Sequence, residues 1–120
     1  MVEKLNGFIG ATEIFDVEAQ DFLEKRKYES VKALIDFSEE LVSKTSSVCD
    51  AFGPGMVALG LTDMIAAQVE DPEKVFGEML TFFEENGITT DVQTESPRYK
   101  SAVCLSVYLE KRLVANSEPV

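Results

Sequence analysis

The spacing of apolar residues predicts helices over most of the chain. From Glu29 to about Cys49, apolar side chains recur at intervals of three, four and seven residues, which is the period of an amphipathic helix. The opposite face of this segment carries Asp, Glu and Ser, and Glu40 stands four residues before Lys44, as in a solvated helix face. This segment has the strongest helical pattern in the sequence.

The N-terminal region shows a different pattern. Residues 8–15 are apolar, contain a glycine and show no helical period, so they predict a short strand or an extended stretch within an arm over residues 1–15. Asp16 then has the character of an N-cap. A first helix over residues 17–27 is expected to follow, because its basic last turn suits the negative end of a helix dipole.

The most apolar segment, residues 56–70, follows a Gly-Pro-Gly turn and is predicted to be the central helix. Its helical projection has one bulky face and one small face. The small face would let another backbone approach closely, either within the fold or across a dimer axis. The bulky face holds Val57, Leu61, Met64 and Ile65, and the small face holds Gly60, Asp63 and Ala67.

Capping signals divide the remaining chain. Asp71 and Pro72 suit the N-cap and first position of a fourth helix, and Gly87 suits a left-handed residue at its end. Residues 88–95 alternate and are rich in Thr, which is typical of a short strand or an extended loop. A last helix is expected from Pro97 to about residue 115.

These elements together predict an all-α chain, folded as one domain. We expect an irregular or orthogonal bundle of about five helices, with at most two short strands, near residues 8–15 and 88–95. Residues 116–120 are expected to be a frayed tail. The length of 120 residues and the 45% hydrophobic content are those of an ordinary globular domain.

Charge is distributed unevenly along the chain. Residues 33–96 carry 13 Asp and Glu against only Lys44 and Lys74, whereas the last 24 residues are net basic. The formal charge of −11 therefore arises in the middle of the chain. Such a surface argues against direct binding to nucleic acid or to an anionic membrane, and is compatible with a basic protein partner or with high solubility alone.

The location predicted from the sequence is cytoplasmic. The N-terminus lacks the features of a secretory signal, and the longest apolar stretch, about 14 residues, is too short to span a bilayer. Cys49 and Cys104 are too few for a disulfide framework, so we expect two reduced, mostly buried thiols.

The residue types present argue against most catalytic chemistry. The chain has no His, which removes the usual general base and zinc ligand. Phosphate-binding glycine loops, Cys-x-x-Cys pairs and EF-hand loops are also missing from the sequence. We therefore predict a protein that is not an enzyme, with no catalytic residue, no cofactor and no metal site.

Two groups of residues are candidates for contacts with partners. The first, called the acidic face below, spans the predicted fourth helix and its approach, and it consists of Glu70, Asp71, Glu73, Glu78, Glu84 and Glu85. The second consists of candidate packing or oligomer contacts. It comprises Gly60, Asp63, Ala67, Arg98, Lys100, Lys111 and Arg112.

Asp63 is anomalous because it lies in so apolar a helix. It has three interpretations: an exposed edge or cap interaction, a buried partner of a cation on the last helix, or, least favoured, a catalytic acid. The acidic face also has a simpler interpretation, as a solvated helix surface.

The leading functional hypothesis is a small regulator or inhibitor that binds a protein partner stoichiometrically and forms a homo-oligomer. A DNA-mimicking inhibitor of a nucleic-acid-binding enzyme is the first alternative, since a row of carboxylates can resemble phosphates. The second is a helical bundle that binds a small molecule in a pocket lined by Phe, Met and Tyr. The small, acidic, His-free composition is similar to that of accessory proteins of phages and other mobile elements.

Overall fold

The computed structural model describes residues 2–25, 30–90 and 96–117. Five helices make up this part of the chain, and no residue in it belongs to a strand. The all-α class and the number of helices are therefore confirmed. The helices are α1 (Val2–Glu24), α2 (Val31–Ser46), α3 (Pro54–Gln68), α4 (Pro72–Glu85) and α5 (Pro97–Ser117).

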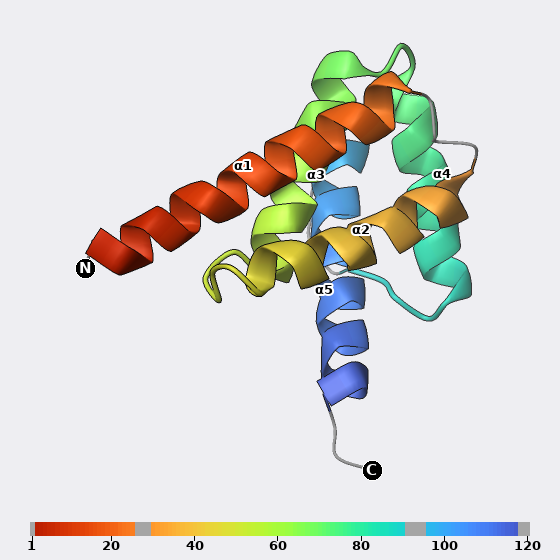
Figure 1. Cartoon of the computed structure of the whole chain (residues 1–120). Coiled ribbons are helices and arrows are strands. Elements are labelled where there is room, and N and C mark those ends of the chain that lie inside the picture. The colour runs from red at the N-terminus through yellow and green to blue at the C-terminus, as the bar shows by residue number, and fades with distance from the viewer. Residues whose placement is uncertain (1, 26–29, 91–95, 118–120) are drawn as a thin grey trace.

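The helices cross at varied angles in an irregular bundle. Helix α5 runs through the centre and packs most extensively against α3 and α4, while α1 and α2 cross over one side of these three (Figure 1). The bundle measures 40 × 36 × 27 Å along its principal axes. The N-terminal end of α1 and the C-terminal end of α5 extend beyond the other helices (Figure 1).

The predicted N-terminal arm is wrong, because α1 runs continuously from Val2 to Glu24. The strand expected at residues 8–15 lies inside this helix, and Asp16 is an exposed residue in its interior instead of its N-cap. The buried residues of α1 recur every three or four positions, which is the period of one long helix. They are Ala11, Phe15, Ala19 and Phe22.

Glycines allow α1 to lie close to its neighbours. A Cβ at Gly7 would stand 3.1 Å from the carbonyl oxygen of Val48, just beyond α2. A Cβ at Gly60 of α3 would stand 2.8 Å from Cζ of Phe15, so the phenyl ring occupies the space that a side chain would need. Gly7 thus serves the packing of α1, and the close approach at Gly60 is made by the Phe15 ring of the same chain and not by a backbone.

The other helix boundaries agree with their capping signals. Helix α2 begins after Ser30, whose hydroxyl accepts the Ala33 N–H at 3.1 Å. The Asp71 carboxylate accepts the Lys74 N–H at 3.3 Å and caps α4 as predicted. Gly87 has a φ of 76°, the left-handed conformation expected after α4.

The predicted second strand and the predicted frayed tail lie partly outside the described residues, as do the end of the predicted first helix and Glu29. Residues 88–90 are neither helix nor strand, and residues 91–95, the rest of the second predicted strand, are outside. Helix α5 continues to Ser117, two residues past the predicted end, so the start of the predicted frayed tail is helical. Residues 118–120 are outside the described ranges.

The core contains apolar side chains and a few satisfied hydroxyls. The Phe22 and Phe37 rings stack between α1 and α2 with centroids 4.2 Å apart. The Ser101 hydroxyl donates to the Phe76 carbonyl at 3.3 Å and joins α5 to α4. In the described part of the chain, no buried side-chain nitrogen or oxygen lacks a hydrogen-bond partner. The buried polar residues there are Ser38, Thr45, Thr62 and Ser101.

Candidate functional site

The acidic face is exposed throughout. All six of its carboxylate residues are exposed, and four of them lie along α4 itself. From Glu73 to Glu85 they extend over about 18 Å at the helical rise of 1.5 Å per residue. Asp71 has a structural role as well, since it caps the helix. The structure thus brings the predicted residues onto one continuous surface.

Four of the described cations pair with carboxylates outside the acidic face. Lys25 pairs with Asp21 at 2.8 Å, Lys44 with Glu18 at 3.1 Å and Arg112 with Glu39 at 2.9 Å. Arg98 pairs with Asp63. Among the described residues, no lysine or arginine forms an ion pair with Glu73, Glu84 or Glu85. The charge of these three carboxylates is therefore left for solvent, counterions or a partner to neutralise.

Two carboxylates of this face occupy an electrostatically unfavourable position. Glu84 and Glu85 stand in the last turn of α4, which contains no basic residue. The C-terminal end of a helix carries partial negative charge, so carboxylates there lower helix stability. These two side chains do not stabilise the fold through the helix dipole or through a described ion pair.

A shallow groove crosses the acidic face at Gly77. The groove has a volume of 530 Å³, and an added Cβ at Gly77 would meet no atom within 4 Å. Glycine is therefore not required there by packing, although it weakens the helix relative to alanine. The groove combines apolar and charged side chains, namely those of Val31, Lys74, Glu78, Thr81, Phe82 and Glu85.

The members of the second candidate group have different surroundings in the structure. Asp63 pairs with Arg98, one of its four predicted partners, but both side chains are at least half exposed, so the buried pair is excluded. Arg112 pairs with Glu39 in the same chain, while Lys111 is exposed and Lys100 is half-buried. Ala67 is exposed on α3.

An apolar cleft lies beside the Asp63–Arg98 pair. Leu59 of α3 is 52% exposed and Tyr99 of α5 is 50% exposed, and both line this cleft of 300 Å³. Met56, one turn before Leu59, is also exposed. Large apolar side chains gathered at the surface are typical of a contact with another protein.

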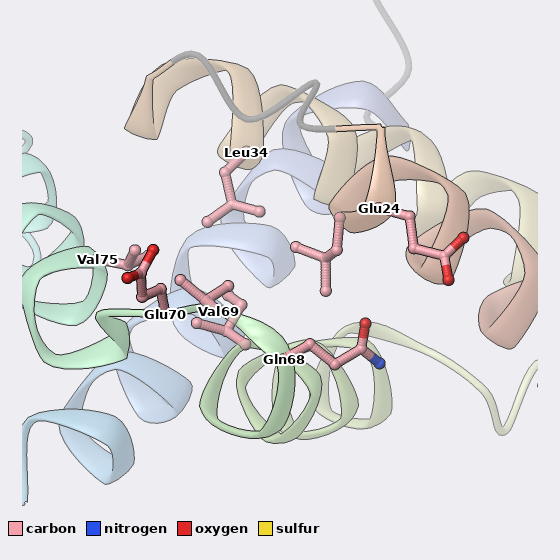
Figure 2. Close-up of a pocket in the computed structure, with 8 residues that line it drawn as sticks. Glu24, Leu34, Gln68, Val69, Glu70 and Val75 are labelled. Atoms are coloured by element: carbon pink, nitrogen blue, oxygen red, sulfur yellow. The ribbon is translucent and has the colours of Figure 1, made fainter.

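Another cavity lies where the ends of α1 and α3 meet the starts of α2 and α4. It measures 430 Å³, within the range of small-molecule sites. In Figure 2, Glu24 and Glu70 lie on opposite sides of the apolar lining, with Leu34 and Val69 between them. The described residues of its lining are Leu23, Glu24, Leu34, Ile65, Gln68, Val69, Glu70 and Val75.

Two side chains on α5, the buried Cys104 and the half-buried Tyr108, have raised pKa values. Burial raises the pKa of the Cys104 thiol above its ordinary value of 9.0. Burial, together with the Glu39 carboxylate, raises the pKa of Tyr108 above 10.0. Both groups therefore stay protonated at neutral pH.

The described ranges contain neither a metal-binding cluster nor a membrane-spanning helix. No group of three or more His, Cys, Asp or Glu side chains in the described ranges is placed to hold a metal ion. None of the helices described is both long enough and apolar enough to cross a membrane. Cys49 and Cys104 are both free thiols.

Comparison with family models found no match, and comparisons with curated proteins and with solved structures found no similar chain. The function is therefore argued from the residues and their geometry.

The sequence did not reveal the cavity between Glu24 and Glu70. Its described lining comes from four helices and the link between α3 and α4, and contains none of the Phe, Met or Tyr side chains expected of a pocket. The period of each helix predicts which residues face inward but not where four helix ends leave a space. The apolar cleft at Leu59 and Tyr99 also depends on the pairing of α3 with α5.

Proposed function

We propose that this protein is a small cytosolic regulator or inhibitor that binds a basic protein partner stoichiometrically through the acidic face. The net negative charge of this face carries the proposal: it holds six carboxylates against Lys74, and no described lysine or arginine forms an ion pair with Glu73, Glu84 or Glu85. Complementary charge steers association and fixes the orientation of a complex.

The groove at Gly77 supports a direct contact. It places the half-buried Val31 and Phe82 side chains between carboxylates, so a partner could bury apolar surface at the centre and form ion pairs at the edge. Interfaces commonly combine an apolar centre with a polar rim. The two free cysteines support a reducing, cytosolic setting.

The spacing of charge favours a protein partner over DNA mimicry. Duplex DNA carries one phosphate per about 1.7 Å of axis, or roughly ten over the 18 Å between Glu73 and Glu85. Helix α4 presents four carboxylates over that length, at Glu73, Glu78, Glu84 and Glu85. A DNA-binding enzyme would therefore meet less than half the charge of its natural ligand.

The test compares the wild type with two double variants, each of which removes two carboxylates. Immobilised wild-type protein and Glu84→Gln/Glu85→Gln would be exposed to source-cell lysate and eluted in steps of increasing salt. We expect the variant to bind the captured partner roughly tenfold more weakly, because two interfacial charges are lost. Its unfolding free energy should not fall, because these carboxylates oppose the dipole of α4.

The matched control is Glu13→Gln/Glu40→Gln, which removes two exposed carboxylates from α1 and α2. This control should retain the partner. Equal losses in the two variants would reject the acidic face as the contact surface. Displacement of the partner by duplex DNA would instead support the mimic hypothesis.

We also propose that two copies of the chain associate through the Leu59 and Tyr99 cleft. The Asp63–Arg98 pair at its edge offers one charge of each sign, as a self-complementary two-fold interface requires. Under this arrangement Asp63 of each copy faces Arg98 of the other.

A further inference from the structure

We propose that the two-fold axis of the dimer runs along the cleft between α3 and α5, so that α3 of each copy lies on α5 of the other. This arrangement rests on the self-association proposed above and adds to it how the two copies are oriented. None of the residues that it uses belongs to the acidic face. Its basis is the register of α3 against α5 within one chain, the exposed side chains along both helices and the position of one ion pair.

Helices α3 and α5 lie side by side and antiparallel within the chain (Figure 1). A Cβ at Gly55 would stand 3.9 Å from Oγ of Ser106, and Asp63 pairs with Arg98. The two contacts are eight residues apart on α3 and eight residues apart on α5, in opposite chain directions. At the helical rise this separation is about 12 Å on both helices, so they keep one register over this length.

Both helices present side chains to solvent beside the cleft. On α3, Met56 is 40% exposed and Leu59 is 52% exposed, and the exposed Asp63 side chain follows one turn later. On α5, Tyr99 is 50% exposed and stands next to Arg98, whose side chain is also exposed. The apolar groups that border this cleft are therefore themselves accessible to another chain.

An axis along the cleft makes its two sides complementary. Rotation about this axis exchanges the α3 side with the α5 side and keeps every residue at its own level along the helices. Leu59 of one copy then packs beside Tyr99 of the other, and Asp63 of one copy faces Arg98 of the other. Because α3 and α5 are antiparallel within the chain, neighbouring helices across the contact are antiparallel too, as in a four-helix bundle.

The charges disfavour the other two-fold arrangement of this surface. An axis that crosses the helices at the cleft would place α3 on α3 and α5 on α5. Asp63 would then approach Asp63 of the second copy, and Arg98 would approach Arg98. Like charges brought together across an interface oppose association, whereas the axis along the cleft brings opposite charges together.

Charge reversal tests whether the ion pairs form between copies. Asp63→Arg and Arg98→Asp each place like charges in both pairs of their own homodimer, whereas a dimer with one copy of each restores both pairs. The two variants would be mixed in equal amounts, at the ammonium acetate concentration where half of the wild type is dimeric, and the dimers resolved by native mass spectrometry. We expect the mixed dimer to be at least about tenfold more abundant than either homodimer.

The matched control reverses an exposed ion pair outside the cleft. Glu18→Lys and Lys44→Glu change the net charge by the same amounts, at the pair that joins α1 to α2. Their mixture should give the statistical proportion, with the mixed dimer about twice as abundant as either homodimer. An equal excess of mixed dimer in both experiments would mean that net charge alone selects the pairs, and the arrangement would be rejected.

A statistical mixture of Asp63→Arg with Arg98→Asp would have a different meaning from the absence of a dimer. If Leu59→Ser still prevents dimerisation, the cleft remains the contact and the axis along it is wrong. A wild type that stays monomeric at every salt concentration would reject the dimer and this arrangement together.

Contacts between Leu59 and Tyr99 of different copies test the arrangement without changing any charge. Dimers with one isotope-labelled and one unlabelled copy would be formed by mixing, and NOEs from the labelled Leu59 methyl groups to the unlabelled copy would be recorded. We expect these NOEs to reach the Tyr99 ring, because Leu59 and Tyr99 border the same cleft from opposite sides. NOEs to Leu59 of the unlabelled copy and none to Tyr99 would overturn the proposal in favour of an axis across the helices.

Discussion

At the scale of single residues, the two cysteines have different surroundings. Cys104 is 2% exposed on α5, and burial raises the pKa of its thiol. Cys49 is half-buried in the turn after α2. Only a thiolate that can meet the reagent reacts, so the burial of Cys104 and its raised pKa should both slow its reaction.

We therefore predict that one thiol of the folded protein reacts fast with a disulfide reagent and the other slowly. Cys104 should react with a disulfide reagent roughly 100-fold more slowly than Cys49, because it reacts only after local opening. Because its raised pKa keeps the Cys104 thiol protonated, Cys104 should stay the slower of the two at neutral pH.

The measurement is the release of chromophore from native wild type, Cys49→Ala and Cys104→Ala, with protein in denaturant as the two-thiol reference. Equal rates for the two single-cysteine variants would contradict the buried position of Cys104.

At the scale of helices, the boundaries followed from local chemistry where a cap was present. Ser30, Asp71 and Gly87 mark ends that their side chains or backbone conformation explain. The N-terminal part of α1 was missed because a short window around residues 8–15 shows no period, whereas Ala11, Phe15 and Ala19 are spaced regularly over the longer segment. The packing role of Gly7 depends on residues 48 and 49, which are distant in sequence.

Helix α4 offers a test of its exposed glycine. Gly77→Ala adds a methyl group where no atom lies within 4 Å, so no clash opposes the gain in helix propensity. We predict that it raises the unfolding free energy by about 0.5–1 kcal/mol, measured by urea denaturation.

The matched control is Gly87→Ala just after the same helix. An added Cβ meets open space there too, but φ is 76°, a conformation that costs alanine roughly 1–2 kcal/mol. The two substitutions should therefore shift stability in opposite directions. A destabilising Gly77→Ala would show that α4 needs this glycine for its own folding.

At the scale of the whole molecule, exposed residues on a single helix were more predictable than surfaces shared between helices. The six carboxylates of the acidic face follow one another along α4 and its approach, so helical spacing predicted their common surface. The Asp63–Arg98 pair was one of several pairings that the sequence allowed, and the antiparallel contact of α3 with α5 selects it. The cavity requires the relative placement of four helices, which no single period contains.

The net charge of the chain should oppose self-association, whereas apolar contact should favour it. Each chain carries a formal charge of −11, so two copies repel at low ionic strength. The Debye length falls from about 10 Å at 0.1 M salt to about 3 Å at 1 M, which screens this repulsion while apolar burial persists. Added salt should therefore strengthen the proposed dimer and weaken partner binding through the acidic face.

Sedimentation equilibrium at increasing NaCl concentration tests this prediction. The dimer fraction of the wild type should rise with salt, and Leu59→Ser should keep the protein monomeric, because it removes an apolar side chain from the centre of the contact. Val17→Ser on α1 is the control, since Val17 is 70% exposed and lies on a different helix. A monomer at every salt concentration would reject self-association. Equal effects of the two substitutions would mean that the dimer contact lies elsewhere. A dimer that weakens with salt would show that ion pairs such as Asp63 with Arg98 dominate over net repulsion.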